Sequence, residues 1–472
     1  MGSLFDEIKK LSGGSYPFHM PGHKREALGN GAFFEALYGV DLTEITGSDD
    51  LHKPEGIIKE AMDRAAALYG SGDTFFLING STAGILAGIS AALDPGKSLL
   101  MMRGSHMSAY HAAVLRHLKV NYIYGEIGTV SGAAMGVNSD EVESALERYP
   151  ETGAVFITSP TYEGYSSDLR TIADAVHKRN IPLIVDAAHG AHFGFSPLFP
   201  ESAVQAGADI VIMSLHKTLP SLTQTALLHL NGNLVPKERI QKYLTVYQSS
   251  SPSYILMAAI DECVRLVSEM KESDWDDFIN RRREMSKKLS GLKHIRIEDH
   301  FSFGDISPKA KIPEPGKMIV MPENRRDGVS LAKYLRSRYR IESELAVPAY
   351  LLLILTICDS EKNFEILCDA LQRADEEYTE WMTDKEAVPA GSRKLQVEPA
   401  VMEMWEAFDA KGEPVEGEQA LGRISASFVT VYPPGRPAVV PGERISREAL
   451  EEIKNAGAAG CEIRGHLSAI VE

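Results

Sequence analysis

The chain has few of the features that mark secreted, membrane-spanning or zinc-bound proteins. Only four cysteines occur among its 472 residues, and none has the close spacing of a zinc site. No apolar run reaches the ~18 residues that a membrane span needs, and the first 20 residues contain no signal-peptide core. These absences predict reduced, packed thiols and a cytoplasmic protein.

Basic residues are also in the minority. Lys and Arg number 49 against 65 Asp and Glu, which gives a formal net charge of -16 at pH 7. A surface for nucleic acid or for an anionic membrane needs a basic stripe, so we expect neither as a partner. The charge leaves a small-molecule substrate open, because a single pocket can carry either sign.

Length and composition favour a globular protein with more than one domain. The chain is 44% hydrophobic and 24% charged, which is enough apolar material to bury a core. It is also too long for one ordinary core. We predict an N-terminal arm over residues 1–50, a large domain over 51–290 and a smaller C-terminal α+β domain over 291–472. The polar stretch 385–420 carries no motif that assigns it a role.

The large domain shows short apolar strands that alternate with amphipathic helices. Strands are predicted over 73–78, 97–102, 153–158, 181–188 and 208–214, and helices over 57–70, 81–93, 105–118 and 168–180. Strands that are apolar throughout, with helices between them, are typical of a mostly parallel sheet covered on both faces. The fold class is therefore predicted to be α/β.

Polar clusters follow five of these strands or strand-like runs. They read "NGST" (79–82), "RGSH" (103–106), "SPTYEG" (159–164), "DAAHGAH" (186–192) and "SLHK" (214–217). In a parallel sheet the carboxyl ends of the strands share one edge, where ligands bind. We expect the five loops to form one site.

Lys217 and Asp186 are the reactive candidates at this edge. Each follows an apolar strand, where an isolated charge costs several kcal/mol unless it is paired, neutralised or used chemically. A partly desolvated lysine can lose its charge near neutral pH and form a Schiff base with an aldehyde. A buried carboxylate needs a backbone cap, a cation or a protonated ring nitrogen as its partner.

Other loop residues have both a structural and a functional interpretation. Ser81 and Thr82 open a helix after Gly80, so they could be ordinary helix caps or could bind a phosphate with the free N–H groups. His106 could cap a helix or stack on a planar ligand. His189 lies close to Asp186 in a metal-like pattern, but no further carboxylate or cysteine cluster completes a site, and we expect no metal.

One cofactor would use all of these groups together. Pyridoxal phosphate needs a lysine for its aldehyde, a carboxylate for its pyridine nitrogen, a phosphate cup and a stacking face. The combination of individually weak signals therefore predicts a pyridoxal phosphate enzyme.

The chain resembles the Orn/Lys/Arg decarboxylase family of fold-type I pyridoxal phosphate enzymes, in its short form without an N-terminal wing domain. The resemblance covers nearly the whole chain. It rests on the motifs "HMPGHKR", "DLTEITGSDDLHKPEG", "INGSTAG", "RGSHMSAYHA", "SPTYEG", "VDAAHGAHFGF", "SLHKTLPSLTQTA", "SSSPSYILMAAID" and "YPPGRPAVVPGE". It implies an aspartate aminotransferase-like large domain and a smaller α+β C-terminal domain.

By motif position, the resemblance also implies roles for single residues. Lys217 would carry the cofactor, Asp186 would hold the pyridine nitrogen, and His106 would stack on the ring. His189 would lie near the cofactor oxygen. The phosphate would be surrounded by Ser81, Thr82, Ser214 and His216.

Further implied roles concern the neighbouring subunit and the substrate. Ser249, Ser250 and Ser251 would reach the cofactor of the neighbouring subunit in a homodimer, or in a larger assembly of dimers. Without the wing domain, the decameric ring of longer relatives is not expected. Glu443 would face the distal cation of the substrate, a role that suits a carboxylate.

The implied reaction is decarboxylation of a basic amino acid, arginine or lysine ahead of ornithine, to agmatine or the diamine plus carbon dioxide, in polyamine biosynthesis. Two alternatives stay open: an aminotransferase or lyase on the same scaffold, and a non-catalytic pseudoenzyme. Arg436 departs from the family pattern, because a cation near a cationic substrate is unfavourable unless it points away or pairs.

Overall fold

The computed structural model describes residues 16–18, 44, 48–126, 128, 133–301, 314–382, 400–432, 435–458 and 461–471. The predicted N-terminal arm, with the motif at 19–25, lies almost wholly outside these residues. Residues 385–399 of the stretch 385–420 also lie outside the described residues.

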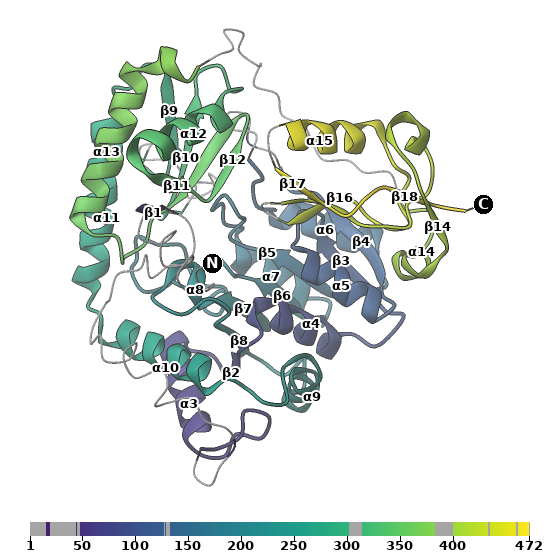
Figure 1. Cartoon of the computed structure of the whole chain (residues 1–472). Helices are drawn as coiled ribbons and strands as arrows, with labels where there is room; N and C mark the ends of the chain where they lie inside the picture. The colour runs from purple at the N-terminus through teal and green to yellow at the C-terminus, as the bar shows by residue number, and fades with distance from the viewer. Residues whose placement is uncertain are drawn as a thin grey trace, which may run out of the picture.

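A seven-stranded sheet forms the centre of the large domain (Figure 1). In this sheet β8 runs antiparallel to both of its neighbours, β2 and β7, and the other described strand pairs are parallel. The strand order is β2 (Asp73–Leu77), β8 (Ala226–Leu230), β7 (Ile210–Ser214), β6 (Leu183–Asp186), β5 (Thr152–Thr158), β3 (Ser98–Met102) and β4 (Lys119–Ile123). The mostly parallel sheet predicted from the sequence is confirmed.

Helices cover both faces of this sheet because its central strands are apolar on both sides. Along β5, Ala154 and Phe156 pack into one core and Val155 and Ile157 into the other. The first core lies under α4 (Gly80–Ala92), α5 (Met107–Leu115) and α9 (Lys237–Tyr247). The second lies under α3 (Ile57–Tyr69), α6 (Ser139–Arg148), α7 (Leu169–His177) and α10 (Tyr254–Glu269).

A smaller antiparallel sheet follows, and its core is continuous with the second face of the large sheet. Its order is β12 (Leu345–Val347), β13 (Tyr350–Ile354), β10 (Lys317–Pro322) and β9 (Ile295–Asp299). The helices beside it are α11 (Glu272–Leu289), α12 (Gly328–Tyr339) and α13 (Glu361–Glu376), followed by the short η2 (Tyr378–Glu380). Strand β1 (Tyr16–Phe18) pairs in parallel with β11 (Ile341–Ser343).

The last part of the chain forms a separate unit over the edge of the large sheet (Figure 1). We call residues 400–471 the C-terminal unit. It contains β15 (Val429–Tyr432), β16 (Arg436–Val439) and β17 (Glu462–Arg464), the pair β14 (Gly412–Pro414) and β18 (Ser468–Ile470), and α14 (Met404–Asp409), η3 (Gly417–Ala420) and α15 (Arg447–Ala458). It has its own small core. The chain after residue 290 thus carries distinct sheets, while the predicted domain boundaries stay predictions.

Sequence patterns located most elements of the large domain but missed four. Strands β4 and β8, helix α6 and the short helix α8 (Leu215–Thr218) were not predicted. Strand β4 carries a polar pattern, Lys119 to Ile123, because it lies at the edge of the sheet, where burial is incomplete.

Within the described ranges, no helix is long and apolar enough to cross a membrane.

Gly84 allows α4 to lie close to the sheet. A Cβ at this position would meet Leu77 Cδ1 at 2.5 Å and Ile212 Cγ2 at 3.1 Å. We therefore expect Gly84→Ala to lower stability by about 1–3 kcal/mol through overpacking, although alanine is the better helix former. A lower thermal midpoint in calorimetry would show this. Gly457→Ala, on helix α15, where a Cβ would make only an ordinary contact with Ile463 Cγ1 at 3.8 Å, should leave the midpoint unchanged or raise it.

Candidate active site

A cavity of about 740 Å³ opens at the carboxyl ends of the large-sheet strands. All five loops singled out in the sequence contribute to its wall, so the predicted convergence is confirmed. The small sheet adds residues of β12 and β13, and the C-terminal unit adds residues of β15, β16 and α15. The wall includes Gly80, Ser81, Thr82, Gly104, His106, Tyr162, Glu163, Asp186, His189, Ser214, His216, Lys217, Val347, Tyr350, Tyr432, Arg436, Glu452 and Asn455.

Lys217 reaches this cavity from a short helix. Strand β7 ends at Ser214, and helix α8 (Leu215–Thr218) follows at once, which turns Lys217 toward the loop of Asp186. Lys217 Nζ lies 3.2 Å from His189 Nε2. Burial lowers the pKa of Lys217, and attraction to Asp186 and Glu344 offsets part of that shift. The shift makes the free amine, which is the nucleophilic form, more accessible than it is in an exposed lysine.

Asp186 is buried at the end of β6. Its side chain is 4% exposed, and Oδ1 accepts a hydrogen bond from the Ala188 N–H at 3.1 Å. Burial raises the pKa of the carboxyl group, while Lys217 lowers it in part. A cationic ring nitrogen in the cavity would stabilise the ionised form further.

The start of helix α4 provides an anion site. Its N-cap residue, Asn79, makes no side-chain cap hydrogen bond, and its Oδ1 accepts from the Ser249 N–H at 3.2 Å. The first N–H groups of α4 therefore point to the cavity without a side-chain cap. Ser81 Oγ and Ser214 Oγ lie 2.6 Å apart, and both line the cavity. Hydroxyls and helix dipole together suit a phosphate.

His106 offers a flat ring to the cavity. It is the N-cap of α5, and its Nδ1 accepts a hydrogen bond from the Ser108 N–H at 3.2 Å. Desolvation, Lys217 and His111 lower the pKa of His106 to about 4, so the ring is neutral at pH 7. On the other side of the site, His216 Nδ1 lies 3.0 Å from the Thr225 carbonyl oxygen.

These groups match the requirements of pyridoxal phosphate. The cavity brings together an amine with a lowered pKa, a buried carboxylate, an uncapped helix N-terminus with two hydroxyls, and an open neutral ring. The donor set fits the cofactor on chemical grounds. In the part of the chain that the structure describes, no three His, Cys, Asp or Glu side chains are grouped to hold a metal ion.

Glu443 is buried within one chain, and its predicted contact with the substrate stays a prediction. It is 3% exposed, and its Oε2 accepts a hydrogen bond from Arg103 Nη2 at 3.1 Å. It is not among the residues of the cavity wall. The reason is electrostatic, because the buried Arg103 guanidinium needs a counter-charge.

The serines of the "SSSPSY" motif lie outside the cavity wall. Ser249, Ser250 and Ser251 are exposed in the loop between α9 and α10. Ser249 contacts Asn79 at the start of α4 of its own chain. Their predicted contact with a neighbouring subunit stays a prediction.

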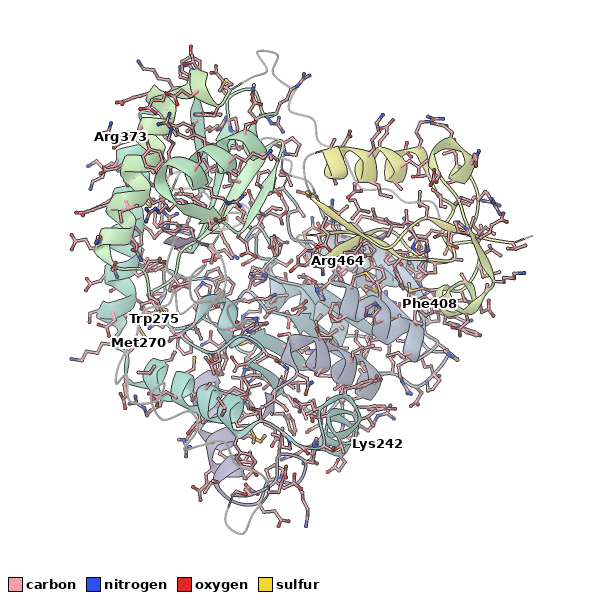
Figure 2. The ribbon with its side chains drawn as sticks, viewed as in Figure 1. Lys242, Met270, Trp275, Arg373, Phe408 and Arg464 are labelled. Carbon is pink, nitrogen blue, oxygen red and sulfur yellow. The ribbon has the colours of Figure 1, made fainter. Side chains whose placement is uncertain are left out.

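Arg436 lines the cavity and is paired, which meets the condition set by the sequence. Its Nη2 donates to Glu452 Oε1 at 2.8 Å. Arg464 of β17, labelled in Figure 2, lies over the ring of Tyr432, another residue of the wall, with its guanidinium carbon 3.6 Å from the ring centre. The C-terminal unit thus presents a neutralised arginine and an aromatic ring to the cavity.

Sequence reasoning missed several polar residues of the site. Glu163 and Tyr162 line the wall and belong to the "SPTYEG" loop, which was recognised only as a whole. Glu452 lies on α15 in a segment without a motif. Lys317 begins the apolar strand β10, and a lysine at such a position was a signal that could have been followed.

The fold defines the class of protein. A lysine decarboxylase from Francisella novicida superposes with a TM-score of 0.78 at 18% identity, covering 95% of this chain and 77% of that one. The constitutive lysine decarboxylase of Escherichia coli gives 0.75 at 17% identity, covering 99% and 81%. The architecture is that of the fold-type I pyridoxal phosphate enzymes.

The sequence comparisons then identify the family. The profile described as "Orn/Lys/Arg decarboxylase, major domain" matches residues 4–363, and the "Orn/Lys/Arg decarboxylase, C-terminal domain" profile matches 390–456. An arginine decarboxylase of Bacillus subtilis is 33% identical over 98% of this chain and 95% of its own length. The chain belongs to the Orn/Lys/Arg decarboxylase family, and it is a pyridoxal phosphate-dependent amino acid decarboxylase.

The Arg103–Glu443 pair predicts a stability effect rather than a substrate effect. Glu443→Gln leaves a buried guanidinium without its counter-charge, so we expect a loss of about 3–5 kcal/mol. Thermal unfolding of the variant should show a clearly lower midpoint. Glu418→Gln, which removes an exposed partner of Arg447, is the matched control and should change little. A native midpoint for Glu443→Gln with impaired substrate binding would contradict this assignment.

Proposed function

We propose that this chain decarboxylates L-arginine to agmatine and carbon dioxide, with L-lysine as the second candidate and L-ornithine behind both. The observation that carries the proposal is a buried carboxylate, Glu163, in the wall of the cavity that contains Lys217. Four near-full-length relatives named arginine decarboxylase, 32–33% identical, support the choice of arginine. The lysine decarboxylase likeness of the fold keeps lysine in second place.

Glu163 has the properties of a cation receptor. It is 7% exposed, and its Oε1 accepts a hydrogen bond from the Tyr350 hydroxyl at 2.9 Å. Burial raises the pKa of Glu163, and the Arg436 charge offsets part of that rise. A guanidinium or ammonium group bound beside it would favour the ionised carboxylate and gain a charge-assisted hydrogen bond.

The balance of charge on this part of the wall favours a cationic ligand. Glu163 and Glu452 supply two carboxylates, and Arg436 supplies one cation that is already paired with Glu452. When both carboxylates are ionised, one negative charge is left for the substrate. A basic substrate side chain would neutralise this negative charge, whereas an acidic side chain would be repelled by it.

The residues that would hold the cofactor are those whose geometry fits it. Lys217 would bond its aldehyde, Asp186 would keep its ring nitrogen protonated, and His106 would stack on the ring. His189 would lie near its oxygen. The phosphate would be held by Ser81, Thr82, Ser214 and His216 with the N-terminus of α4. When bound, pyridoxal phosphate supplies an electron-withdrawing ring that accepts the electron pair left as carbon dioxide departs.

The protein's own groups would govern the proton transfers. Lys217 Nζ or a nearby histidine would return a proton to Cα of the substrate. The buried Asp186 carboxylate would hold a proton at the ring nitrogen throughout. Both groups meet the cavity directly, so neither step needs a relay through bulk water.

We propose a homodimer, or a higher assembly of dimers, in which Ser249 to Ser251 approach the neighbouring cavity. Their exposure beside the start of α4 supports this arrangement. We also propose a cytoplasmic location and domain boundaries at residues 50 and 290, as predicted from the sequence pattern, and a part in polyamine biosynthesis, as the family resemblance implies.

The first test is product formation from L-arginine, L-lysine and L-ornithine in parallel, with pyridoxal phosphate added. We expect agmatine and carbon dioxide from arginine at the highest kcat/KM. The Lys217→Ala variant is the matched control and should form neither product. Faster release of cadaverine or putrescine would overturn the choice of substrate, and silence on all three would overturn the proposed substrate class.

Glu163 gives a second, more specific test. Glu163→Gln keeps the shape of the side chain and removes its charge, so the substrate loses a charge-assisted contact of about 1.5–3 kcal/mol. We expect KM for arginine to rise by about 10- to 100-fold, with a smaller change in kcat. Steady-state kinetics would measure both. Glu147→Gln on the exposed face of α6 should leave both constants unchanged, and an unchanged KM in Glu163→Gln would refute the role of Glu163.

A further inference from the structure

Lys317 is a fully buried lysine that the proposed chemistry does not use. It begins β10 of the small sheet, and its exposed fraction is 0%. Burial of an ammonium group is costly unless its surroundings compensate. One of the groups that contact Lys317 is His189, a residue of the active-site cavity wall.

The described groups near the Lys317 amine include a histidine, an aromatic ring and a carboxylate. Its Nζ lies 3.0 Å from His189 Nδ1 and 5.9 Å from the centre of the Tyr162 ring. The Glu314 carboxylate lies close enough for Lys317 to lower its pKa, together with His192, whose Nε2 is 3.0 Å from Glu314 Oε2. A carboxylate and an aromatic face both favour the charged ammonium form.

The path of the Lys317 side chain depends on a glycine. Gly164 has φ +99°, and a Cβ there would come within 2.8 Å of Lys317 Cβ. The Gly164 carbonyl oxygen also accepts the Glu314 N–H at 2.8 Å. Since other residues rarely adopt this φ, the "SPTYEG" loop is shaped to let the lysine stem pass toward His189.

The contact with Lys317 bears on which nitrogen of His189 carries the proton. In its ammonium form Lys317 can only donate, so His189 Nδ1, 3.0 Å away, would accept and the ring proton would then lie on Nε2. Nε2 faces Lys217 Nζ at 3.2 Å. From this position the Nε2–H group donates to the lone pair of a neutral amine. The opposite tautomer would place a lone pair there and would favour the ammonium form of Lys217.

We propose that Lys317 is a positioning residue that holds His189 as its Nε2–H tautomer, so that His189 donates a hydrogen bond to Lys217 and keeps it as the free amine. The proposal rests on the assignment of Lys217 as the reactive lysine. Its groups come from two parts of the fold, with Lys317 on the small sheet, His189 on a loop of the large sheet and Lys217 on helix α8. Among the described residues, the titratable groups close to these three side chains include Asp186, Glu344, Glu314, His106, His216 and Tyr162.

The tautomer can be observed in the native full-length protein. With ¹⁵N-labelled histidine, the chemical shifts of the two ring nitrogens show which one is protonated, and the signals that vanish in His189→Gln assign the ring. We expect His189 to be protonated at Nε2 in the native protein and to lose that preference in Lys317→Met. A native His189 protonated at Nδ1, or an unchanged tautomer in the variant, would overturn the proposal.

The consequence for Lys217 can be measured by its reactivity. Acetic anhydride labels only the neutral amine, and peptide mass spectrometry of the full-length protein, without added cofactor, gives the labelling of Lys217 against pH. We expect Lys317→Met to raise the pKa of Lys217 by about one unit, since a donor to the amine is replaced by an acceptor. Labelling below that pKa should therefore be about tenfold slower. An unchanged labelling curve would contradict the proposal.

Two further variants separate positioning from simple charge. The double variant Lys317→Met/Glu314→Gln removes one positive and one negative charge, so the net charge is unchanged. It also avoids leaving the buried Glu314 carboxylate without the Lys317 charge, which helps the protein to fold if the single variant is unstable. We expect it to show the same raised pKa of Lys217, whereas a return to the native curve would mean that only the local charge matters. Lys293→Met, at an exposed lysine of the same part of the chain, should change nothing. None of these readouts requires turnover, so their failure is distinct from failure of the proposed substrate.

Discussion

The loss of hydration at the Lys217 amine is the constraint on which the rest of the site depends. Burial lowers the pKa of this group, and only part of the shift is offset by Asp186 and Glu344. Burial affects the neighbouring histidines in the same way, because the loss of hydration and the nearby amines lower the pKa of His189 and of His106. Around the Asp186 carboxylate the site therefore groups an amine and two histidines whose pKa values are all lowered, which is the environment that a reactive amine requires.

The fold supplies this environment through the ends of parallel strands. Strands β6 and β7 are neighbours in the sheet, so Asp186 and Lys217 leave it side by side. Helix α4 packs against β7, which places its N-terminus on the same edge. The chain belongs to the Orn/Lys/Arg decarboxylase family, whose cofactor needs an amine, a carboxylate and a phosphate site close together, and this edge of the sheet provides them.

Sequence alone predicted the parts of the site that local patterns determine. Lys217, Asp186, Ser81 and His106 all follow strands, and the rule for strand ends was enough to bring them together. The contact between Glu443 and Arg103 was not predicted, because the two residues lie 340 positions apart in sequence and a buried guanidinium leaves no local signal of the carboxylate that it needs. Lys317 did leave a local signal, a lysine at the start of an apolar strand, but its contact with His189 on a loop of the large sheet could not be read from that strand.

The C-terminal unit has a small hydrophobic core of its own, and its residues Met404 and Val440 also pack into the core of the large sheet. The buried Arg103–Glu443 pair joins the same two parts of the chain. These buried contacts fix the distance between the C-terminal part of the cavity wall, which carries Arg436, Tyr432 and Glu452, and the strand ends that carry Asp186 and Lys217.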